Sequence, residues 1–379
     1  MDQTAKKTTP EIIMRQAVQL ARRGAGWVKT NPLVGAVLVY RGQIIATGYH
    51  ARFGGPHAER RAVQSALQRY PKRIVQHATL YVTLEPCTHD GKTPACTPWL
   101  IAQGIKEVII GSRDPNPLEH GRSVRWLRRA GLQVTSGVAQ TDCDYLIRCY
   151  QKWITTKMPF VLGKVGMSID GKISAPKHQR YISNPAALYR VHQLRQEFDS
   201  LIVGVNTIVH DNPRLTTRLS LHRLSHPIKI ILDSYLRTPL SSQAIDEHTV
   251  MVCRETASRQ RKTAFIKKGA DILELPVDPT GGRLLTGYMD MQRLLQELGR
   301  RNITSVIIEG GANVFTTFIN NQAIDEFYIF MAPAIYGATR LPFTYALDQV
   351  VQLTSVQVEQ LDDNILVRGY AHYSSYSIS

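Results

Sequence analysis

The sequence predicts an α/β protein built from two domains, and three observations lead to this prediction. The chain has 379 residues, which at about 100–200 residues per domain suffices for two. Short apolar runs of strand length alternate with segments of helical apolar spacing, which is typical of a mostly parallel sheet. Residues 152–159 keep no apolar period and lead through Pro159 into a new strand. We therefore place the first domain at residues 8–152 and the second at residues 158–372.

In the first domain, predicted helices and strands alternate from the start. Residues 11–22 carry apolar side chains at helical spacing, and residues 34–40 form a short apolar run before Gly42, which predicts a strand. The same two patterns predict the following elements in order: a helix at 58–67, a strand at 78–84, a helix at 99–103, a strand at 107–110 and a helix at 123–130 that stops at Gly131.

The second domain continues the alternation with longer polar loops between its elements. Helices are predicted at residues 185–195, 291–298 and 314–320. The polar residues 372–379 are predicted to form a loosely held tail. Buried strands are predicted at 160–165, 200–204, 228–232, 249–252 and 305–308.

Composition and charge narrow the class of protein. Hydrophobic residues make up 43% of the chain and charged residues 20%, which indicates a large core and excludes a mainly disordered chain. The sequence has neither an apolar run of membrane-spanning length nor a signal-peptide stretch at its start, so we expect a cytoplasmic protein with no membrane partner. The net charge of +16 admits nucleic acid or phosphorylated metabolites as partners, or a merely solvated basic surface. Five cysteines, an odd number, argue against a disulfide framework.

One group of residues in the first domain has the composition of a zinc site. His57 opens a predicted helix, Cys87 follows a buried strand, and Cys96 precedes the next helix. Three ligands leave a fourth position on Zn²⁺ for water, and the metal lowers the pKa of that water from 15.7 to about 7. Glu59, two residues after the histidine, can shuttle protons without binding the metal. Each residue alone would be ordinary, but H-x-E followed by P-C and a second cysteine is the signature of zinc nucleobase deaminases.

The spacing of the two cysteines separates this chain from deaminases that act on nucleic acid. Those enzymes carry P-C-x-x-C, whereas eight residues lie between the cysteines here. Within and beside that loop, Thr88, Lys92 and Thr93 can reach a phosphate group. His89 is either an alternative metal ligand or a loop residue near the substrate.

The second domain gathers polar residues where predicted strands end. The turn at 309–313 follows a buried strand and opens a helix, so its backbone N–H groups suit a phosphate, although a plain strand-to-helix turn has the same sequence. Lys164, the loop at 207–218 and Ser234 lie in or after other strands. Ligands of open α/β sheets bind at the carboxyl ends of strands, whereas each of these residues singly also fits turn chemistry.

Both halves resemble the bifunctional deaminase/reductase family of riboflavin biosynthesis, over residues 10–370. The first half carries the motifs NPLVGAV at 31–37, GPHAE at 55–59, YVTLEPCTHDGKTPAC at 81–96 and DPNP at 114–117. The second half carries GKVGMSIDGKI at 163–173, HQLR at 192–195, TIVHDNPRLTTR at 207–218, ILDS at 231–234 and IIEGG at 307–311. The resemblance implies a cytidine-deaminase-like zinc domain followed by a dihydrofolate-reductase-like domain.

The resemblance also implies roles for individual residues. In the first domain, His57, Cys87 and Cys96 would bind Zn²⁺, Glu59 would shuttle protons and Asn31 would bind the substrate. In the second domain, the implied NADPH contacts are Gly166, Tyr181, Thr207, Asp211, Ser234, Gly311, Ala312 and Asn313. The implied substrate contacts there are Lys164, Gln179, Arg195, Leu215, Arg218 and Glu309.

The implied reactions are zinc-dependent removal of the 2-amino group of 2,5-diamino-6-(5-phosphoribosylamino)pyrimidin-4(3H)-one, and then NADPH-dependent reduction of the ribosyl group to ribityl. The partner would therefore be a small phosphorylated pyrimidine and not nucleic acid, and a homo-oligomer is expected. The chain departs from the family pattern at Gln179, where serine is usual, at Tyr181, where tryptophan is usual, and at Asn212, where aspartate is more frequent. Arg60 and Arg61 replace smaller or apolar residues after the H-A-E motif.

Two alternatives stay open at this point. A nucleic-acid deaminase would account for the positive charge, but the long cysteine loop and the absence of an aromatic-basic stripe speak against it. A deaminase with a degenerate, non-catalytic reductase half would account for the altered segment at residues 177–183.

Overall fold

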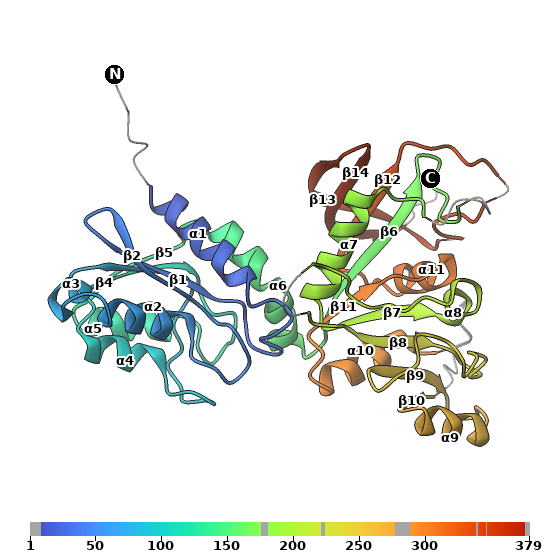
Figure 1. The fold of residues 1–379 in the computed structure, drawn as a ribbon, viewed down its shortest axis with the longest axis horizontal. Coiled ribbons are helices and arrows are strands. Elements are labelled where there is room, and N and C mark those ends of the chain that lie inside the picture. The colour runs from blue at the N-terminus through green and yellow to red at the C-terminus, as the bar shows by residue number, and fades with distance from the viewer. Residues whose placement is uncertain are drawn as a thin grey trace. The chain divides into compact units, whose positions relative to one another are not determined.

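The computed structural model describes residues 9–175, 181–220, 224–276, 289–338, 340–345 and 347–375. The chain divides into two compact units, Met1–Lys157 and Met158–Ser379. Each unit has its own sheet and its own hydrophobic core (Figure 1). Among the described helices, none is long and apolar enough to cross a membrane.

The first unit is built on a five-stranded sheet with the order β2-β1-β3-β4-β5. Strands β3, β4 and β5 are parallel, whereas β1 is antiparallel to both of its neighbours. The strands are β1 (Gly35–Tyr40), β2 (Gln43–Tyr49), β3 (Thr79–Leu84), β4 (Glu107–Ser112) and β5 (Gln133–Ser136). The helices are α1 (Pro10–Arg22), α2 (Ala58–Leu67), α3 (Lys72–Gln76), α4 (Cys96–Gln103), α5 (Arg122–Arg129) and α6 (Gln140–Thr156).

Two glycines bring helices directly onto the sheet of the first unit. A Cβ on Gly35 of β1 would collide with the carbonyl oxygen of Ala17 in α1, and a Cβ on Gly48 of β2 would collide with the carbonyl oxygen of Ala58 in α2. Only glycine permits such close backbone approach. The packing of α2 on β2 places the start of that helix, with His57 and Glu59, over the edge of the sheet.

The structure corrects several expectations for the first unit. Strand β2 was not predicted, because its outer half is exposed and its apolar run is interrupted at Gly48. Helix α6 was not predicted either, and it continues through Lys152 to Thr156, beyond the predicted end of the first domain. Polar and apolar residues alternate along α6 too irregularly to give a clear helical period.

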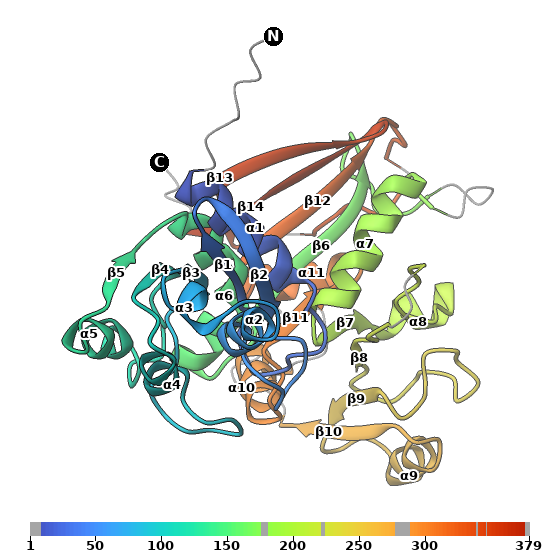
Figure 2. The same ribbon diagram turned by 60° about the vertical axis from the view of Figure 1, so that its left-hand side comes forward.

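The second unit is built on a nine-stranded sheet with the order β10-β9-β8-β7-β11-β6-β12-β14-β13. The strands from β10 to β12 are parallel, and β14 and β13 are antiparallel additions at one edge (Figure 2). The strands are β6 (Phe160–Ser168), β7 (Ser200–Gly204), β8 (Ile228–Leu232), β9 (Thr249–Arg254), β10 (Asp271–Leu275), β11 (Ser305–Ile308), β12 (Glu326–Ala332), β13 (Gln349–Leu361) and β14 (Asn364–Ser375).

The helices of the second unit begin where their sequences provide caps. Helix α7 (Pro185–Glu197) starts with proline after Asn184, whose side chain accepts a hydrogen bond from Ala187 N. Helix α10 (Met291–Arg300) starts after Asp290, which accepts from Arg293 N in the same way. The remaining helices are α8 (Val205–Asp211), α9 (Arg259–Lys267) and α11 (Ala312–Asn320).

The C-terminal expectation was wrong. Residues 372–375 belong to strand β14, which pairs with both β12 and β13, and do not form a loose tail. The sequence did not reveal this hairpin because most of β13 is exposed and polar, so that no buried alternation marks it. Residues 376–379 lie outside the described part of the chain.

Candidate functional site

Three side chains converge on one point of the first unit. His57 precedes α2, Cys96 is the first residue of α4, and Cys87 lies three residues beyond β3. His57 Nδ1 lies 3.5 Å from Cys87 Sγ and 3.3 Å from Cys96 Sγ, and the ligand atoms of all three residues lie within 4.8 Å of one another. Tetrahedral zinc with bonds of about 2.3 Å to sulfur and 2.0 Å to nitrogen separates its ligand atoms by about 3.5 Å. The donor set therefore fits zinc in both chemistry and spacing.

The surroundings favour thiolate at Cys87. The Cys96 thiol beside Cys87 is the largest cause, and with His57 and the backbone N–H of Cys96 it lowers the pKa of Cys87 to about 4 in spite of burial. A thiolate is the form that binds metal. Cys96 starts α4, so the positive end of that helix dipole also faces the two sulfur atoms.

Glu59 lies beside the cluster and is not part of it. The residue is 3% exposed on the inner face of α2, and its Oε2 has no hydrogen-bond partner among the described residues. Burial raises the pKa of this carboxyl group above its ordinary value. A buried carboxyl group with an unsatisfied oxygen is costly to keep, and here it is available to a ligand of the site.

Asn31 reaches the same place through a residue that sequence reasoning missed. His50 follows β2; its Nε2 lies 3.0 Å from Asn31 Nδ2 and its Nδ1 lies 3.3 Å from Pro56 O. Burial lowers the pKa of His50, so the neutral ring donates from Nδ1 to Pro56 O and accepts from the Asn31 amide. The rings of His50 and His57 are 5.3 Å apart. The hairpin that carries His50 was not predicted, so nothing in the sequence connected it with the site.

The loop between the two cysteines is held by a buried carboxylate. Glu119 is 3% exposed and accepts hydrogen bonds from Thr88 N at 2.7 Å, from Thr88 Oγ1 at 2.8 Å and from His89 Nδ1 at 2.9 Å. His89 is therefore bound to Glu119 and does not belong to the metal cluster, so its alternative role as a ligand is not supported. Thr93 Oγ1 reaches His57 Nε2 at 3.1 Å, and Lys92 Nζ lies 4.2 Å from the centre of the Phe53 ring.

The unusual Arg60 has a structural role beside the site. Its Nη2 donates to Pro94 O at 3.2 Å and to Ala95 O at 3.0 Å, and its guanidinium lies 4.8 Å from the centre of the Trp99 ring. Arg60 thus ties α2 to the segment that leads into Cys96. This contact explains why a long basic side chain is accommodated next to the H-A-E motif.

A second polar cluster lies in the second unit. Arg195 binds Glu309 through two parallel hydrogen bonds of 2.8 and 2.6 Å, and its Nη1 donates to Thr216 O at 3.1 Å. Burial raises the pKa of Glu309, but Arg195 and Lys164 outweigh burial and bring it to about 2. Burial lowers the pKa of Lys164, which Glu309 only partly offsets. Four predicted substrate contacts are thereby related, because Arg218 Nε lies 3.3 Å from His192 Nε2 beside the pair.

His192 is a member of this cluster that sequence reasoning left without a role. Burial, Arg195 and Arg218 lower its pKa to about 4, so the ring is neutral at pH 7. Leu215 is 4% exposed and takes a left-handed backbone conformation with φ of 55°. Gln179 lies outside the described residues.

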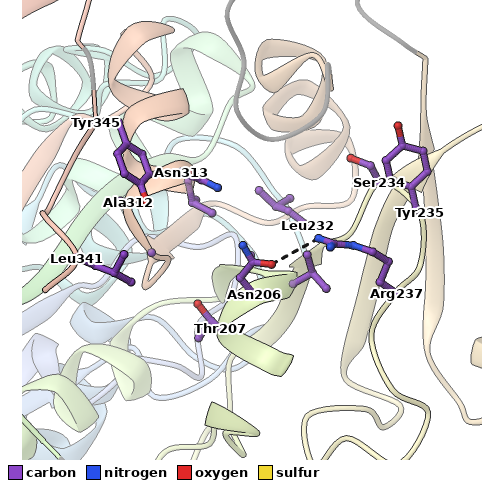
Figure 3. Close-up of a pocket in the computed structure, with 14 residues that line it drawn as sticks. Asn206, Thr207, Leu232, Ser234, Tyr235, Arg237, Ala312, Asn313, Leu341 and Tyr345 are labelled. Carbon is purple, nitrogen blue, oxygen red and sulfur yellow. Dashed lines mark hydrogen bonds between the residues drawn. The ribbon is translucent and has the colours of Figure 1, made fainter. Parts of the chain in front are cut away.

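A cavity of about 470 Å³ opens at the carboxyl ends of β7, β8 and β11 (Figure 3). Five predicted cofactor residues line it: Thr207, Ser234, Gly311, Ala312 and Asn313. Its other lining residues were not predicted, and they include Asn206, Tyr235, Arg237, Leu341 and Tyr345.

The three remaining predicted cofactor residues are not among those that line the cavity. Gly166 lies within β6, Asp211 is the last residue of α8, and Tyr181 is 43% exposed.

The backbone at one end of the cavity suits a phosphate-bearing ligand. A Cβ at Gly310 would come within 2.6 Å of Val314 Cβ, so only glycine fits that position, and a Cβ at Gly311 would meet nothing within 4 Å. Helix α11 begins directly after this turn and directs its first N–H groups toward the cavity. The size of the cavity and this turn fit the phosphates and one ring of a dinucleotide.

Asn212, which departs from the family pattern, is explained by its position at the end of α8. Its backbone is left-handed with φ of 40°, a conformation that asparagine tolerates well. Its side-chain oxygen accepts from Gln243 N at 2.9 Å and from Ser242 Oγ at 3.3 Å. Asparagine therefore terminates this helix and fixes the loop that follows.

A histidine–dicysteine site with a neighbouring buried glutamate, on an α/β sheet, defines a zinc-type deaminase domain; a parallel sheet with a dinucleotide-sized cavity beside an ionic cluster defines a reductase-type domain. Comparison with known families agrees for both halves. The family described as the cytidine and deoxycytidylate deaminase zinc-binding region matches residues 7–112, and the RibD C-terminal domain matches residues 159–367. The chain belongs to the RibD family of bifunctional deaminase/reductases of riboflavin biosynthesis.

Individual relatives support this membership over nearly the whole length. The riboflavin biosynthesis protein RibD of Actinobacillus pleuropneumoniae is 37% identical over 372 residues, which cover 96% of this chain and 95% of the relative. RibD of Escherichia coli is 32% identical over 345 residues, covering 86% and 89%. Among solved structures, Acinetobacter baumannii RibD aligns with a TM-score of 0.81 at 31% identity, covering 96% of this chain and 98% of that one. A deaminase/reductase from Thermotoga maritima aligns with a TM-score of 0.79 at 33% identity, with the same coverage.

Proposed function

We propose that the chain removes the 2-amino group of 2,5-diamino-6-(5-phosphoribosylamino)pyrimidin-4(3H)-one with Zn²⁺, and then reduces the ribosyl group of the product with NADPH. The observation that carries the first step is the buried Glu59 carboxyl group, whose Oε2 has no described partner, beside the His57, Cys87 and Cys96 ligand set. This arrangement matches the chemical needs of hydrolytic deamination, in which a proton must move from water to the substrate.

In the deaminase domain, bound zinc would supply a Lewis acid that lowers the pKa of a coordinated water. Glu59 takes the proton that this water loses, passes it to the ring nitrogen, and returns a proton to the departing ammonia. Its raised pKa suits this role, since a carboxyl group that gains and loses a proton near neutral pH shuttles efficiently. The Asn31 amide, oriented by neutral His50, hydrogen-bonds the substrate ring.

The cysteine loop would hold the phosphorylated end of this substrate. Thr88, Lys92 and Thr93 lie on the loop between the metal ligands, and Glu119 fixes its start. A lysine and two hydroxyl groups are suitable partners for phosphate oxygens. The loop therefore favours a small phosphorylated pyrimidine over a nucleic-acid strand, and the chain is expected to need no nucleic-acid or membrane partner.

In the reductase domain, the nicotinamide of NADPH would supply a hydride to C1′ of the ribosyl group. The same step breaks the bond between C1′ and the ring oxygen, so that oxygen must receive a proton. Lys164 is placed to give this proton, because burial lowers its pKa and so eases deprotonation of its ammonium group. Glu309 keeps Lys164 protonated before reaction by its negative charge.

The substrate phosphate of the second step falls to Arg218 in this proposal. Arg195 uses its Nε and Nη2 on Glu309, so its guanidinium is not open to a two-pronged contact with phosphate. Arg218 makes only bonds of 3.3 Å to His192 among its described contacts. Arg195 instead positions Glu309, while Leu215 and Gln179 complete the expected pocket.

The cofactor would lie in the cavity with its pyrophosphate against the turn from Gly311 to Asn313 and the start of α11. Thr207 and Ser234 line the same cavity. Gly166, Tyr181 and Asp211 remain part of the proposed NADPH site, although they are not among the lining residues. The intact cavity and ionic cluster speak against a degenerate reductase half.

The proposal also covers organisation. We assign the deaminase domain to residues 8–152 and the reductase domain to residues 158–372, and expect a cytoplasmic protein. A homo-oligomer is supported by β13, a strand of 13 residues at the edge of the sheet, whose Val356 and Val358 are 50% and 67% exposed. Analytical ultracentrifugation of the full chain tests this expectation, and a monomer at all concentrations would contradict it.

A coupled assay tests the two activities together. Zinc-loaded protein is mixed with the diaminopyrimidine ribosyl phosphate and NADPH, and ammonia release and NADPH absorbance are followed in the same tube. We expect ammonia release first and then loss of NADPH absorbance. Ammonia without loss of NADPH would support the deaminase-only alternative, and absence of both would contradict the whole proposal.

A further inference from the structure

We propose that Arg237 makes the reductase domain select NADPH over NADH by binding the 2′-phosphate of the cofactor. This inference rests on the proposed function, because it requires a nicotinamide dinucleotide in the cavity beside β8. It adds a residue that determines specificity and that lies outside the set predicted from the sequence.

Arg237 is distinguished by its charge. Among the fourteen described residues that line the cavity, it is the one ionised side chain, and no carboxylate faces it there. In Figure 3 its guanidinium lies at the same side of the cavity as Ser234 and Tyr235, away from Ala312, Leu341 and Tyr345. A single arginine in an otherwise neutral cavity favours an anionic group at that end.

The strand order sets which end of the cofactor lies near Arg237. The reacting nicotinamide must approach Lys164 on β6 and Glu309 after β11. Strand β8, which leads to Ser234 and Arg237, is separated from β6 by β7 and β11. Three strand spacings of about 4.8 Å make this about 14 Å across the sheet. The nicotinamide therefore occupies the β6 and β11 side, and the adenosine half extends toward β8.

The 2′-phosphate is the only group that distinguishes NADPH from NADH, and it sits on the ribose of that adenosine half. Arg237 is therefore placed at the end of the cavity where the two cofactors differ. A guanidinium binds phosphate oxygens through paired hydrogen bonds. An arginine near the adenosine ribose is also how other dinucleotide-binding sheets accept NADP.

The side chain of Arg237 retains donors for such a contact. Its one described hydrogen bond runs from Nη2 to Asn206 Oδ1 and is long, at 3.5 Å. A guanidinium has five N–H groups, so four others remain for a ligand. Asn206 belongs to the first turn of α8 and orients the guanidinium across the mouth of the cavity (Figure 3).

Equilibrium binding to the full-length protein tests this inference without catalytic turnover. Dissociation constants for NADPH and NADH are measured by isothermal titration calorimetry on the wild-type protein, on Arg237→Gln and on Arg237→Lys. We expect Arg237→Gln to weaken NADPH binding by about tenfold, the loss of one charge-assisted contact at an exposed position, and to leave NADH binding within twofold. Arg237→Lys should retain part of the preference, because it keeps the charge and loses the fork.

Salt and a matched control sharpen the test. NADPH binding by the wild-type protein should weaken with added salt more steeply than NADPH binding by Arg237→Gln, since screening acts on the charged contact. Arg300→Gln, on exposed α10 outside the cavity, should change neither constant. Ammonia release by the first domain should be the same in all variants and confirms that they are folded.

Three results would overturn the inference. Equal losses of NADPH and NADH affinity in Arg237→Gln would show a structural role through Asn206. An unchanged preference for NADPH would show that another group reads the 2′-phosphate. Wild-type protein that binds neither nucleotide would refute the proposed reductase activity itself, and this inference with it.

Discussion

Replacing Glu309 by glutamine should destabilise the second unit by about 3 kcal/mol at pH 7. Glu309 is 8% exposed and pairs with Arg195, while Lys164 lies nearby. Its pKa of about 2 is about 2.5 below the ordinary value of 4.5, and about 1.4 kcal/mol per pKa unit makes this a contribution of about 3 kcal/mol. Glutamine keeps the shape but leaves two buried cations without their counter-charge.

The pH dependence follows from the direction of this pKa change. Because the pKa is lower in the folded state than in the unfolded state, the ionised carboxylate stabilises the fold. The contribution is fully present above about pH 4.5 and is lost as the pH falls through about 2. Glu309→Gln should therefore lack this part of the acid dependence that the wild-type protein shows.

The distribution of tryptophan provides the assay. The chain has four tryptophans, Trp27, Trp99, Trp126 and Trp153, and all lie in the first unit. Tryptophan fluorescence during urea unfolding thus reports on the first unit, whereas circular dichroism reports on both. Glu309→Gln should lower the second transition seen by circular dichroism and leave the fluorescence transition in place.

A matched control and a clear refutation complete this test. Glu297→Gln on α10 removes an ion pair that is about one-third exposed, so it should cost less than about 1 kcal/mol. The reasoning is refuted if Glu309→Gln unfolds at the wild-type urea concentration at pH 7. It is equally refuted if the variant and the wild-type protein lose stability identically between pH 4.5 and 2.

Three further predictions concern the first unit. Glu59→Gln should slow ammonia release by at least about 100-fold while zinc content and NADPH binding stay unchanged, and near-normal turnover would remove Glu59 from the proton path. Glu119→Ala should lower the free energy of unfolding of this unit by about 2–3 kcal/mol, measured by tryptophan fluorescence, because three donors from Thr88 and His89 lose their buried acceptor. Removal of zinc by a chelator should lower the fluorescence transition and leave the later circular dichroism transition unaltered; a shift of both transitions would contradict independent unfolding.

Much of the zinc site could be predicted from the sequence because its geometry is local to three element boundaries. His57, Cys87 and Cys96 each sit where a helix starts or a strand has just ended, and the H-x-E and P-C spacings report this directly. The alternation of strands and helices likewise indicated parallel sheets, which the structure confirms for most of both units. The spacing of apolar residues is enough for this, since period and burial go together.

The partners of those residues could not be predicted, because they come from distant segments. His50, Glu119 and His192 carry no local signature, and each meets its partner only after the sheet has formed. The hairpin of β13 and β14 was missed for a related reason. Its outer strand is exposed and polar, so that pairing with β12 and not a buried pattern holds it in place.

The sequence by itself determined the class of chemistry: a zinc-type deaminase set joined to a phosphate-binding α/β half. That information is carried by residue type and short spacing, which survive in one dimension. Only the tertiary structure decided that Arg195 is committed to Glu309, that the cavity lies along β7, β8 and β11, and that Arg237 is its one described charge. These facts depend on which strands become neighbours, and strand order is set by packing of the whole unit.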